Sequence, residues 1–406
     1  MHDMKDSGVE WIGEIPAHWS PIRFRFIAKI TTGNQDTQNA DPDGEYPFYV
    51  RSPIVERCNN YTFDGKGILM AGDGAGAGRV FHLVDGKYAV HQRVYRFYDF
   101  KYMDPVLLKY YLENLFATVM DYGSAKTTVP SVRLPMIQDF VVCVPPKKEQ
   151  DNIVAVLNEK CDQVGSLISN VQAQIEKLKA YKQSLITEVV TKGLDPTVPM
   201  KDSGFEWIGE IPAHWEVKRG KVLFVESDAR SADGSEELLT VSQYTGITPR
   251  SQKNVNMFEA LTLEGYKICD VGDIAANTMW LWAGAIGVSA YSGVISPSYN
   301  VYRQKAENFV PGYLDCLLRA PMLVQEYASR STGIRASRLR LYPKDFLNIM
   351  FPVPPFGEQQ EIMRVLSDKF AAVDKLIAIK ESKIEKLEQY KKSLIYEYVT
   401  GKREVM

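Results

Sequence analysis

An internal duplication constrains this chain more than any other feature. Residues 4–19, MKDSGVEWIGEIPAHW, return at residues 200–215 with one change, Val9 to Phe205. A second block at residues 175–191, IEKLKAYKQSLITEVVT, returns at 384–400 as IEKLEQYKKSLIYEYVT. Repetition of this kind indicates copies of one structural unit. The chain is therefore predicted to contain two copies, each with the repeated motif, a variable body and a tail.

The two tails carry apolar residues at the a and d positions of a heptad pattern, in both copies at an offset of 209 residues. An a/d stripe kept over about five heptads is typical of a coiled coil. Each tail buries its stripe most simply against the other, so the tails are predicted to pair within the chain. The predicted interface consists of Leu157, Val164, Ile168, Val171, Ile175, Leu178 and Leu185 with Leu366, Phe370, Val373, Ile377, Ile384, Leu387 and Leu394.

Both tails begin after a double proline, Pro145-Pro146 and Pro354-Pro355, each followed shortly by Glu-Gln. Proline suits the first turn of a helix, and an acidic side chain there complements the helix dipole. The first tail has no further proline until Pro196, so each helix is predicted to run about 40 residues, or about 60 Å. Gly165 is the weak point of the first helix, and Lys192-Gly193 is its predicted end.

The bodies between motif and tail share little sequence, which indicates two different heads on a common frame. Runs typical of strands occur at 88–98 and 300–302, and stretches typical of helices at 104–121 and 311–329. We therefore predict an α+β fold with circular pseudo-two-fold symmetry, in which two mixed α/β domains are joined by the two long helices. The predicted segments are the motif at 1–19, a domain at 20–145, a helical region at 146–199, the second motif at 200–215, a domain at 216–354 and a helical region at 355–406.

Composition excludes several classes of protein. A length of 406 residues suits two or three domains, and a formal net charge of −2 means that nucleic-acid binding would need local basic patches. The five cysteines are odd in number and form no CxxC pair, which argues against disulfides and a zinc site. The first residues lack the apolar run of a signal peptide, and no stretch reaches about 18 apolar residues. We expect a cytoplasmic protein.

Two segments resemble catalytic motifs without matching them. The glycine run at 72–78 fits neither GxGxxG nor GxxxxGK[ST], so a turn or backbone-contact loop is predicted there instead of a nucleotide site. Pro354-Pro355-Phe356 resembles the Asn/Asp-Pro-Pro-aromatic motif of amino-methyltransferases. Val353, however, stands where that chemistry needs a carboxamide or carboxylate. A helix start is predicted at this position.

The remaining polar candidates also favour structural roles. Glu176, Lys177 and Lys179 have the spacing of half a nuclease site, but they fall on the polar face of a heptad helix. His18 and His214 lie between Ala and Trp in the two repeated motifs, where a structural contact is favoured over catalysis. The sequence thus shows no nucleophile–base pair, metal cluster or phosphate loop.

Two basic segments lie shortly before the double prolines. Residues 330–340, RSTGIRASRLR, contain four arginines, and residues 123–134, GSAKTTVPSVRL, contain one lysine and one arginine. Hydroxyl residues interleaved with basic residues suit phosphate contacts, although a solvated loop is the alternative. Residues 277–287, NTMWLWAGAIG, are predicted to form a core strand and turn with some surface aromatic. The candidate DNA contacts are Arg79, Lys126, Arg133, Asn277, Trp280, Arg330, Arg335, Arg338 and Arg340.

Together these motifs resemble the specificity subunit of type I restriction–modification enzymes, and the resemblance covers the whole chain. It is carried by SGxEWIGEIPxHW twice, by PPxxEQ at 145–150 and 354–359, and by KLxxYKxSLIxExVT twice. Residues 272–303 are also similar to the body of a recognition domain of that family, and the first body has a looser similarity. The resemblance implies two target-recognition domains alternating with two helical regions that pair as an antiparallel coiled coil.

The resemblance also implies a function. A non-catalytic subunit without a cofactor of its own would read a bipartite site in double-stranded DNA. It would dock two modification subunits, which bind S-adenosylmethionine, and two restriction subunits, which use ATP and Mg, with no membrane involved. Heads at the two ends of a rod would read two different half-sites about one helical turn apart.

Two further expectations follow from the sequence. The duplication predicts that the N-terminal motif packs near the C-terminus, as the second motif packs near the end of the first tail. A coiled-coil protein-interaction scaffold that never binds DNA is the alternative function, and the near-neutral charge favours it slightly.

Overall fold

The computed structural model describes residues 3–123, 130–253, 262–333 and 339–405. The chain divides into two compact units: unit 1 is Met1–Gln172 with Glu381–Met406, and unit 2 is Ala173–Lys380. Each unit combines one body, one repeated motif and a part of both long helices, α3 (Lys147–Lys192) and α8 (Phe356–Val399). The α+β class, with two mixed domains and two long helices, is confirmed.

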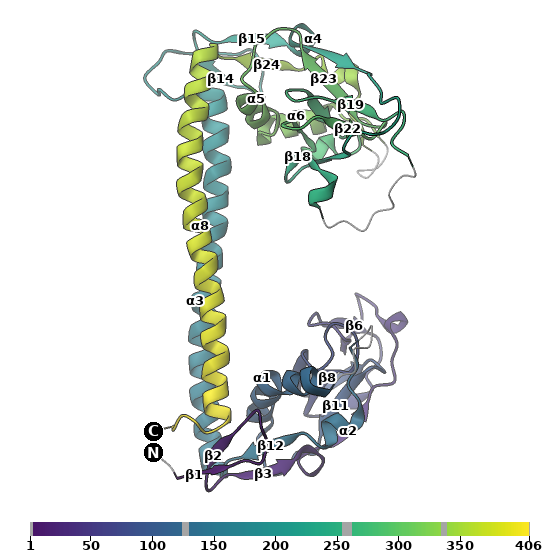
Figure 1. The fold of residues 1–406 in the computed structure, drawn as a ribbon, viewed down its shortest axis with the longest axis vertical. Coiled ribbons are helices and arrows are strands. Elements are labelled where there is room, and N and C mark those ends of the chain that lie inside the picture. The colour runs from purple at the N-terminus through teal and green to yellow at the C-terminus, as the bar shows by residue number, and fades with distance from the viewer. Residues whose placement is uncertain (1–2, 124–129, 254–261, 334–338, 406) are drawn as a thin grey trace. The chain divides into compact units, whose positions relative to one another are not determined.

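Unit 1 is built around a four-stranded antiparallel sheet of order β4-β11-β8-β9. Helix α1 packs on this sheet (Figure 1). Its Leu108 and Leu112 share a core with Met70 and Phe97 of the strands. A second sheet has the order β6-β5-β10-β7. The elements before α3 are β1 (Met4–Asp6), β2 (Glu14–Pro16), β3 (Ser20–Arg23), β4 (Lys29–Thr32), β5 (Tyr46–Tyr49), β6 (Glu56–Cys58), β7 (Phe63–Asp64), β8 (Gly67–Ala71), β9 (Phe81–Val84), β10 (Lys87–Val90), β11 (Val94–Tyr98), α1 (Pro105–Gly123), α2 (Leu134–Gln138) and β12 (Val141–Val144).

Unit 2 repeats this plan, with a four-stranded sheet of order β16-β23-β20-β21. Strand by strand it corresponds to the sheet of unit 1, although the two bodies have little sequence in common. Its elements before α8 are β13 (Met200–Asp202), β14 (Glu210–Pro212), β15 (Glu216–Arg219), α4 (Gly220–Leu223), β16 (Phe224–Ser227), β17 (Leu239–Ser242), β18 (Gly246–Pro249), β19 (Lys267–Cys269), β20 (Ile274–Ala276), β21 (Ile286–Val288), β22 (Gly293–Ile295), β23 (Asn300–Gln304), α5 (Pro311–Leu318), α6 (Pro321–Arg330), α7 (Pro343–Phe346) and β24 (Met350–Val353).

Two predicted elements were wrong in detail. The run at 88–98 is two strands, β10 and β11, with a turn at 91–93 between them. The stretch at 311–329 is two helices, α5 and α6, because Pro321 cannot continue α5 and begins a new helix at its first position. The predicted helix near 104–121 is confirmed as α1, where the Asp104 carboxylate accepts a hydrogen bond from the Val106 amide at 2.8 Å.

The long helices run antiparallel within unit 2. Lys182 Nζ of α3 donates to Asp374 Oδ1 of α8 at 2.7 Å, and Lys380 Nζ donates to Gln174 Oε1 at 2.6 Å. Of the 14 residues predicted for the interface, eight are buried and six are half-buried. Helix α3 has 46 residues and α8 has 44, slightly more than expected, and α3 continues through Gly165.

Each repeated motif is fastened to the first turn of a long helix. In unit 1 the Trp19 indole donates to Glu149 Oε1 at 3.1 Å, and His18 Nε2 lies 2.9 Å from Glu149 Oε2. In unit 2 Trp215 and His214 contact one carboxylate oxygen of Glu358 at 3.0 and 2.8 Å. The predicted structural contact of the two histidines is confirmed.

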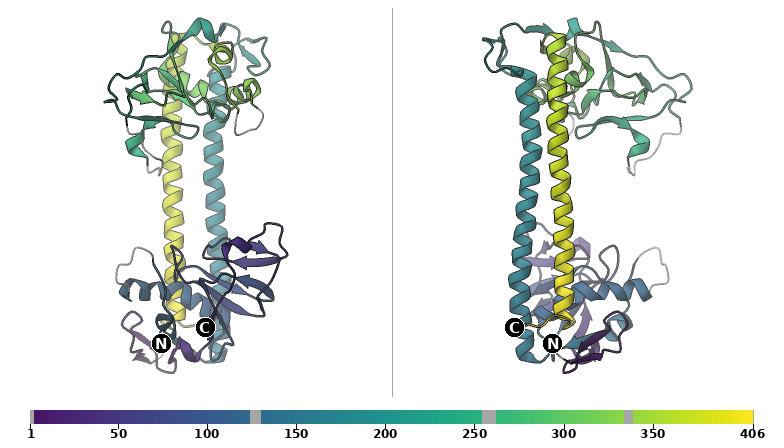
Figure 2. Two further views of the ribbon diagram at one scale, coloured as in Figure 1. Left: turned by 90° about the vertical axis from the view of Figure 1, so that its right-hand side faces the viewer. Right: turned by 60° about the vertical axis from the view of Figure 1, so that its left-hand side comes forward.

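The N-terminal motif packs against the end of α8, as predicted. A Cβ built on Gly401 would lie 2.4 Å from Pro16 and 3.1 Å from Trp19, and Tyr396 donates to the Trp11 carbonyl at 3.5 Å. Strand β1 lies close to the end of α8 (Figures 1 and 2). Within the described part of the chain, no helix is long and apolar enough to cross a membrane.

Candidate nucleic-acid interface

The equivalent sheets of the two units place two loops at corresponding positions. The first loop, residues 72–80, joins β8 to β9, and the second loop, residues 277–285, joins β20 to β21. Each joins the third and fourth strands of its sheet and spans nine residues. The first contains four glycines and no aromatic residue, whereas the second contains two tryptophans. One frame thus presents two chemically different loops.

Close backbone packing explains two of the four glycines of the first loop. A Cβ on Gly76 would lie 2.6 Å from the Arg51 carbonyl, and one on Gly72 would lie 2.8 Å from the Arg93 carbonyl. The same loop pairs with the segment before α2, because the Val132 amide donates to the Gly72 carbonyl at 2.8 Å. The prediction of a backbone-contact loop is confirmed.

This pairing brings two candidate DNA contacts into one region of unit 1. Arg79 lies at the end of the first loop and Arg133 directly follows the paired segment, and both side chains are exposed. Lys126, the third candidate from this body, lies outside the described residues.

A cavity of about 660 Å³ lies beside the first loop. Arg51 lines it and donates to Asp73 Oδ1 at 3.0 Å, while Glu56 contributes an oxygen, Oε2, that is buried and has no hydrogen-bond partner among the described residues. Carboxylates accept hydrogen bonds from the exocyclic amine of cytosine, and arginines donate to guanine. Sequence reasoning missed these three residues, because only the folded chain brings 51, 56 and 73 together.

The second loop is a tightly fixed turn. The Trp280 carbonyl accepts hydrogen bonds from the Ala283 amide at 3.0 Å and the Ala285 amide at 3.1 Å. Gly284 has a φ of 87°, a left-handed conformation that glycine adopts without strain, and its Cα faces Val324 of α6. The prediction of a strand and turn with a surface aromatic is confirmed, since Trp280 is 50 % exposed.

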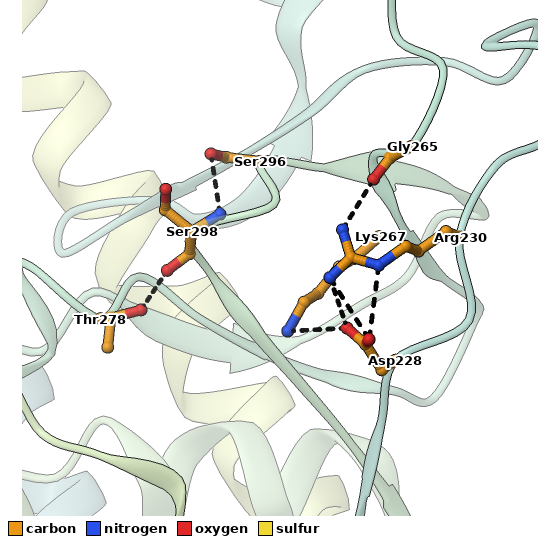
Figure 3. Close-up of polar contacts among 7 residues, drawn as sticks. All are labelled: Asp228, Arg230, Gly265, Lys267, Thr278, Ser296 and Ser298. Atoms are coloured by element: carbon orange, nitrogen blue, oxygen red, sulfur yellow. Dashed lines mark hydrogen bonds and ion pairs between the residues drawn. The ribbon is translucent and has the colours of Figure 1, made fainter.

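Asn277 does not fit its predicted role as a DNA contact. Its side chain is 6 % exposed, and the amide nitrogen donates to the Tyr299 hydroxyl at 2.9 Å while the amide oxygen accepts from the Met279 amide at 3.2 Å. Both ends of the amide are therefore used inside the fold. Asn277 holds the second loop, with support from the hydrogen bond of Thr278 to the Ser298 carbonyl (Figure 3).

The arginine-rich segment after α6 is described only at its two ends. Thr332 and Arg340 pair through two backbone hydrogen bonds of 3.0 Å, and the Arg340 side chain is exposed. Arg330 forms an ion pair with Glu326 one turn earlier in α6, which reduces its availability for phosphate. Arg335 and Arg338 lie outside the described residues.

A further charged cluster in unit 2 was not predicted. The Asp228 carboxylate accepts hydrogen bonds from Arg230 at 2.9 Å and lies 3.3 Å from Lys267 Nζ (Figure 3). The hydrogen bonds from Arg230, and secondarily from Lys267, hold the pKa of Asp228 below its usual value. The cluster keeps one net positive charge. Residues 228, 230 and 267 are distant in sequence, so no local motif indicated it.

Comparison with known proteins finds several that are similar to this chain. The family model for the type I restriction modification DNA specificity domain matches residues 16–177. The EcoDI specificity subunit of a type I restriction enzyme from Escherichia coli is 20% identical, over 89% of this chain and 83% of its own. The MjaVIII specificity subunit from Methanocaldococcus jannaschii is 24% identical, over 96% of this chain and 93% of its own.

The fold has a counterpart among solved structures. A chain from a study of complex assembly and conformational transition of the type I R-M system superposes with a TM-score of 0.67. The two chains are 15% identical, and the match covers 96% of this chain and 99% of the other. The shared fold therefore extends over nearly the whole of both chains.

Over most of its length the chain is similar to the specificity subunits of type I restriction–modification systems. Such a subunit determines which DNA target the system recognises and leaves catalysis to its partner subunits. Members of this family bind no cofactor themselves. Among the described residues, no three His, Cys, Asp or Glu side chains gather as a metal site would require. The scaffold that never binds DNA is set aside.

Proposed function

We propose that this chain reads an asymmetric, bipartite site in double-stranded DNA, one half-site with each recognition domain. The observation that carries the proposal is the pair of equivalent loops, 72–80 and 277–285, which have equal length and different side chains. Base edges are distinguished by the hydrogen-bond and apolar partners that a protein presents in the grooves. Different loops at corresponding positions therefore favour two different half-sites.

Exposed cations near these loops supply sequence-independent affinity in this proposal. Arg79 and Arg133 serve the first half-site and Arg340 the second, and each phosphate contact adds to the salt dependence of binding. Lys126, Arg335 and Arg338 are assigned the same role from their sequence context. Trp280 contributes an apolar contact.

The two long helices set the gap between half-sites in this proposal. The heptad pattern recurs at an offset of 209 residues in the two tails, and the first tail is the part of the sequence that links the first body to the second motif. The chain docks two modification subunits, which supply S-adenosylmethionine-dependent methylation, and two restriction subunits, which supply ATP- and Mg-dependent cleavage. The complex works in the cytoplasm.

Mapping methylated adenines in a host that expresses the chain with its partners tests the half-site assignment. We expect a bipartite motif with two unlike halves. Replacing residues 277–285 by a glycine–serine loop of the same length should relax one half only, and the same replacement at 72–80 should relax the other. A single undivided motif, or loss of both halves with either replacement, contradicts the proposal.

The role of the helices is tested by inserting one heptad into both α3 and α8. Seven residues add about 10 Å of helix, which corresponds to about 3 base pairs of duplex. We expect methylation-site sequencing to show the same half-sites with a longer gap. An unchanged gap in an active complex refutes this part of the proposal.

A further inference from the structure

The second loop presents an aromatic surface that the fold itself does not use. Trp280 and Trp282 stack with ring centroids 5.7 Å apart and planes at 26°. Trp280 is 50 % exposed and the neighbouring Met279 is 38 % exposed. The Trp282 indole donates to the Met279 carbonyl at 3.0 Å, whereas half of the Trp280 side chain is exposed. Trp282 is therefore fixed to the loop, whereas the exposed part of the Trp280 ring is accessible to a ligand.

The turn that carries this pair is rigid. Trp280 is held at both backbone groups, since its amide donates to the Asn277 carbonyl at 2.9 Å and its carbonyl accepts two amides. The buried Asn277 side chain donates to the Tyr299 hydroxyl. The Thr278 hydroxyl donates to the Ser298 carbonyl (Figure 3), so both residues fasten the start of the turn. A fixed aromatic ring loses little conformational entropy when it binds, so the arrangement suits a role in which a side chain must enter a confined space.

The corresponding loop of unit 1 lacks this feature altogether. Residues 72–80 join the equivalent strands with the same number of residues but contain neither Trp nor Met. The shared frame therefore does not require aromatic residues at this position. The tryptophan pair belongs to what distinguishes the second head from the first.

From this asymmetry we propose that Trp280, supported by Trp282, inserts as a wedge at one base step of the half-site read by unit 2 and stacks on the base it separates. The inference rests on the proposed function, because it needs DNA at this loop. Apolar side chains that enter a base step unstack it and kink the duplex, and every base offers a face on which an indole can stack. Since the cost of unstacking depends on the step, the wedge would add specificity where no base edge is read.

The wedge makes a quantitative prediction. Trp280→Ala should weaken binding of the intact site by about 5- to 150-fold, the range that one base–aromatic stack contributes. Trp280→Phe, which keeps a ring, should retain most of the affinity. Tyr244→Ala provides the control, because Tyr244 is 81 % exposed in the same unit but lies outside the second loop. In the Tyr244→Ala complex, a mismatched base pair should change the affinity for DNA as it does in the wild-type complex.

The decisive measurement is a mismatch scan with the complex of the full chain and its modification subunits. A single mismatched pair is placed at each step of the mapped site in turn, because a mismatch lowers the cost of unstacking at that step. The wild-type complex should bind about tenfold more tightly at one step of the second half-site. Trp280→Ala should lose this gain, and Trp280→Phe should keep it.

The possible outcomes distinguish a failure of the wedge proposal from a failure of the proposed function. Identical mismatch profiles for wild type and Trp280→Ala overturn the wedge, even if the variant binds more weakly, because the indole would then be an ordinary contact. If the wild-type complex does not prefer its mapped site over unrelated DNA, the proposed function itself fails and the wedge fails with it. Thermal unfolding of each variant verifies that the fold is intact.

Discussion

Gly165 offers a direct test of how α3 is packed. It lies inside the helix, and a Cβ built on it would meet no heavy atom within 4 Å. Alanine is more favourable than glycine in a helix interior by about 0.8–1.0 kcal/mol, and no clash opposes the change here. For a folding unit of about 200 residues, 1 kcal/mol shifts the Tm by about 2–4 °C. We predict that Gly165→Ala raises the Tm of unit 1 by that amount.

The glycine directly after the same helix supplies a control for which the opposite change in Tm is expected. Gly193 ends α3 with a φ of 74°, and a Cβ there would lie 2.8 Å from Glu358 Oε1 and 3.4 Å from Trp215. Gly193→Ala should therefore lower the Tm, since a left-handed alanine costs about 1–2 kcal/mol before any clash is counted. Calorimetry of the full chain measures both variants. A Tm that does not rise in Gly165→Ala refutes the reasoning about the open position.

The duplication sharpens this test. In unit 2, Lys182 Nζ lies 2.7 Å from Asp374 Oδ1. The offset of 209 residues makes Lys391 the counterpart of Lys182 and Gly165 the counterpart of Asp374. Burial raises the pKa of the Cys161 thiol and the charge of Lys391 opposes this, so Lys391 lies near this part of α3. An aspartate at position 165 is expected to form an ion pair with Lys391. The free energy of unfolding of Gly165→Asp should therefore be higher than that of Gly165→Asn by about 0.2–1 kcal/mol at low salt. The difference should vanish in 1 M NaCl if the pair forms.

Three further variants probe other parts of the molecule. Glu358→Ala removes the acceptor of two side chains and should lower the free energy of unfolding by about 1–3 kcal/mol in denaturant titrations, whereas an unchanged value would mean that the motif holds without it. Arg340→Ala should reduce the slope of log affinity against log salt by about 1, and Arg364→Ala on α8 should leave that slope unchanged. Burial, aided by Arg51, lowers the pKa of His91, so the unfolded chain takes up the proton first and stability should fall as pH drops below about 6.5. The loss at pH 5.5 is at most about 1.4 kcal/mol, and the Tm of His91→Asn should be less sensitive between pH 7.5 and 5.5.

The frame of the molecule could be predicted because its signals are local or periodic. The heptads of both tails, the double prolines and the near-identical motifs each fix structure through neighbouring residues. The sequence also contains the signal that divides residues 311–329 into two helices, because Pro321 lies inside that stretch and cannot continue a helix. The turn at 91–93 was not, because His-Gln-Arg contains no glycine or proline to mark it.

The candidate interface was harder to predict because burial depends on tertiary packing. Asn277 has the composition of a base-reading residue, yet the Tyr299 hydroxyl and a backbone amide occupy its side chain. Arg51, Glu56 and Asp73 meet at one cavity although no motif joins them. Exposure of Trp280 followed from sequence only as a general expectation of surface aromatics, and the anchoring by Trp282 required coordinates.

The division of the chain into units has a consequence for biosynthesis. Unit 2 is a continuous stretch, 173–380, and can finish folding while the ribosome is still at work. Unit 1 cannot, because the core around Ile15 and Trp19 also contains Leu394, Ile395 and Val399. Until residues 381–406 have been made, the first domain exposes an apolar surface that chaperones and proteases recognise. We therefore expect a chain truncated before residue 381 to leave the core of the first domain incomplete, while the second domain can still fold.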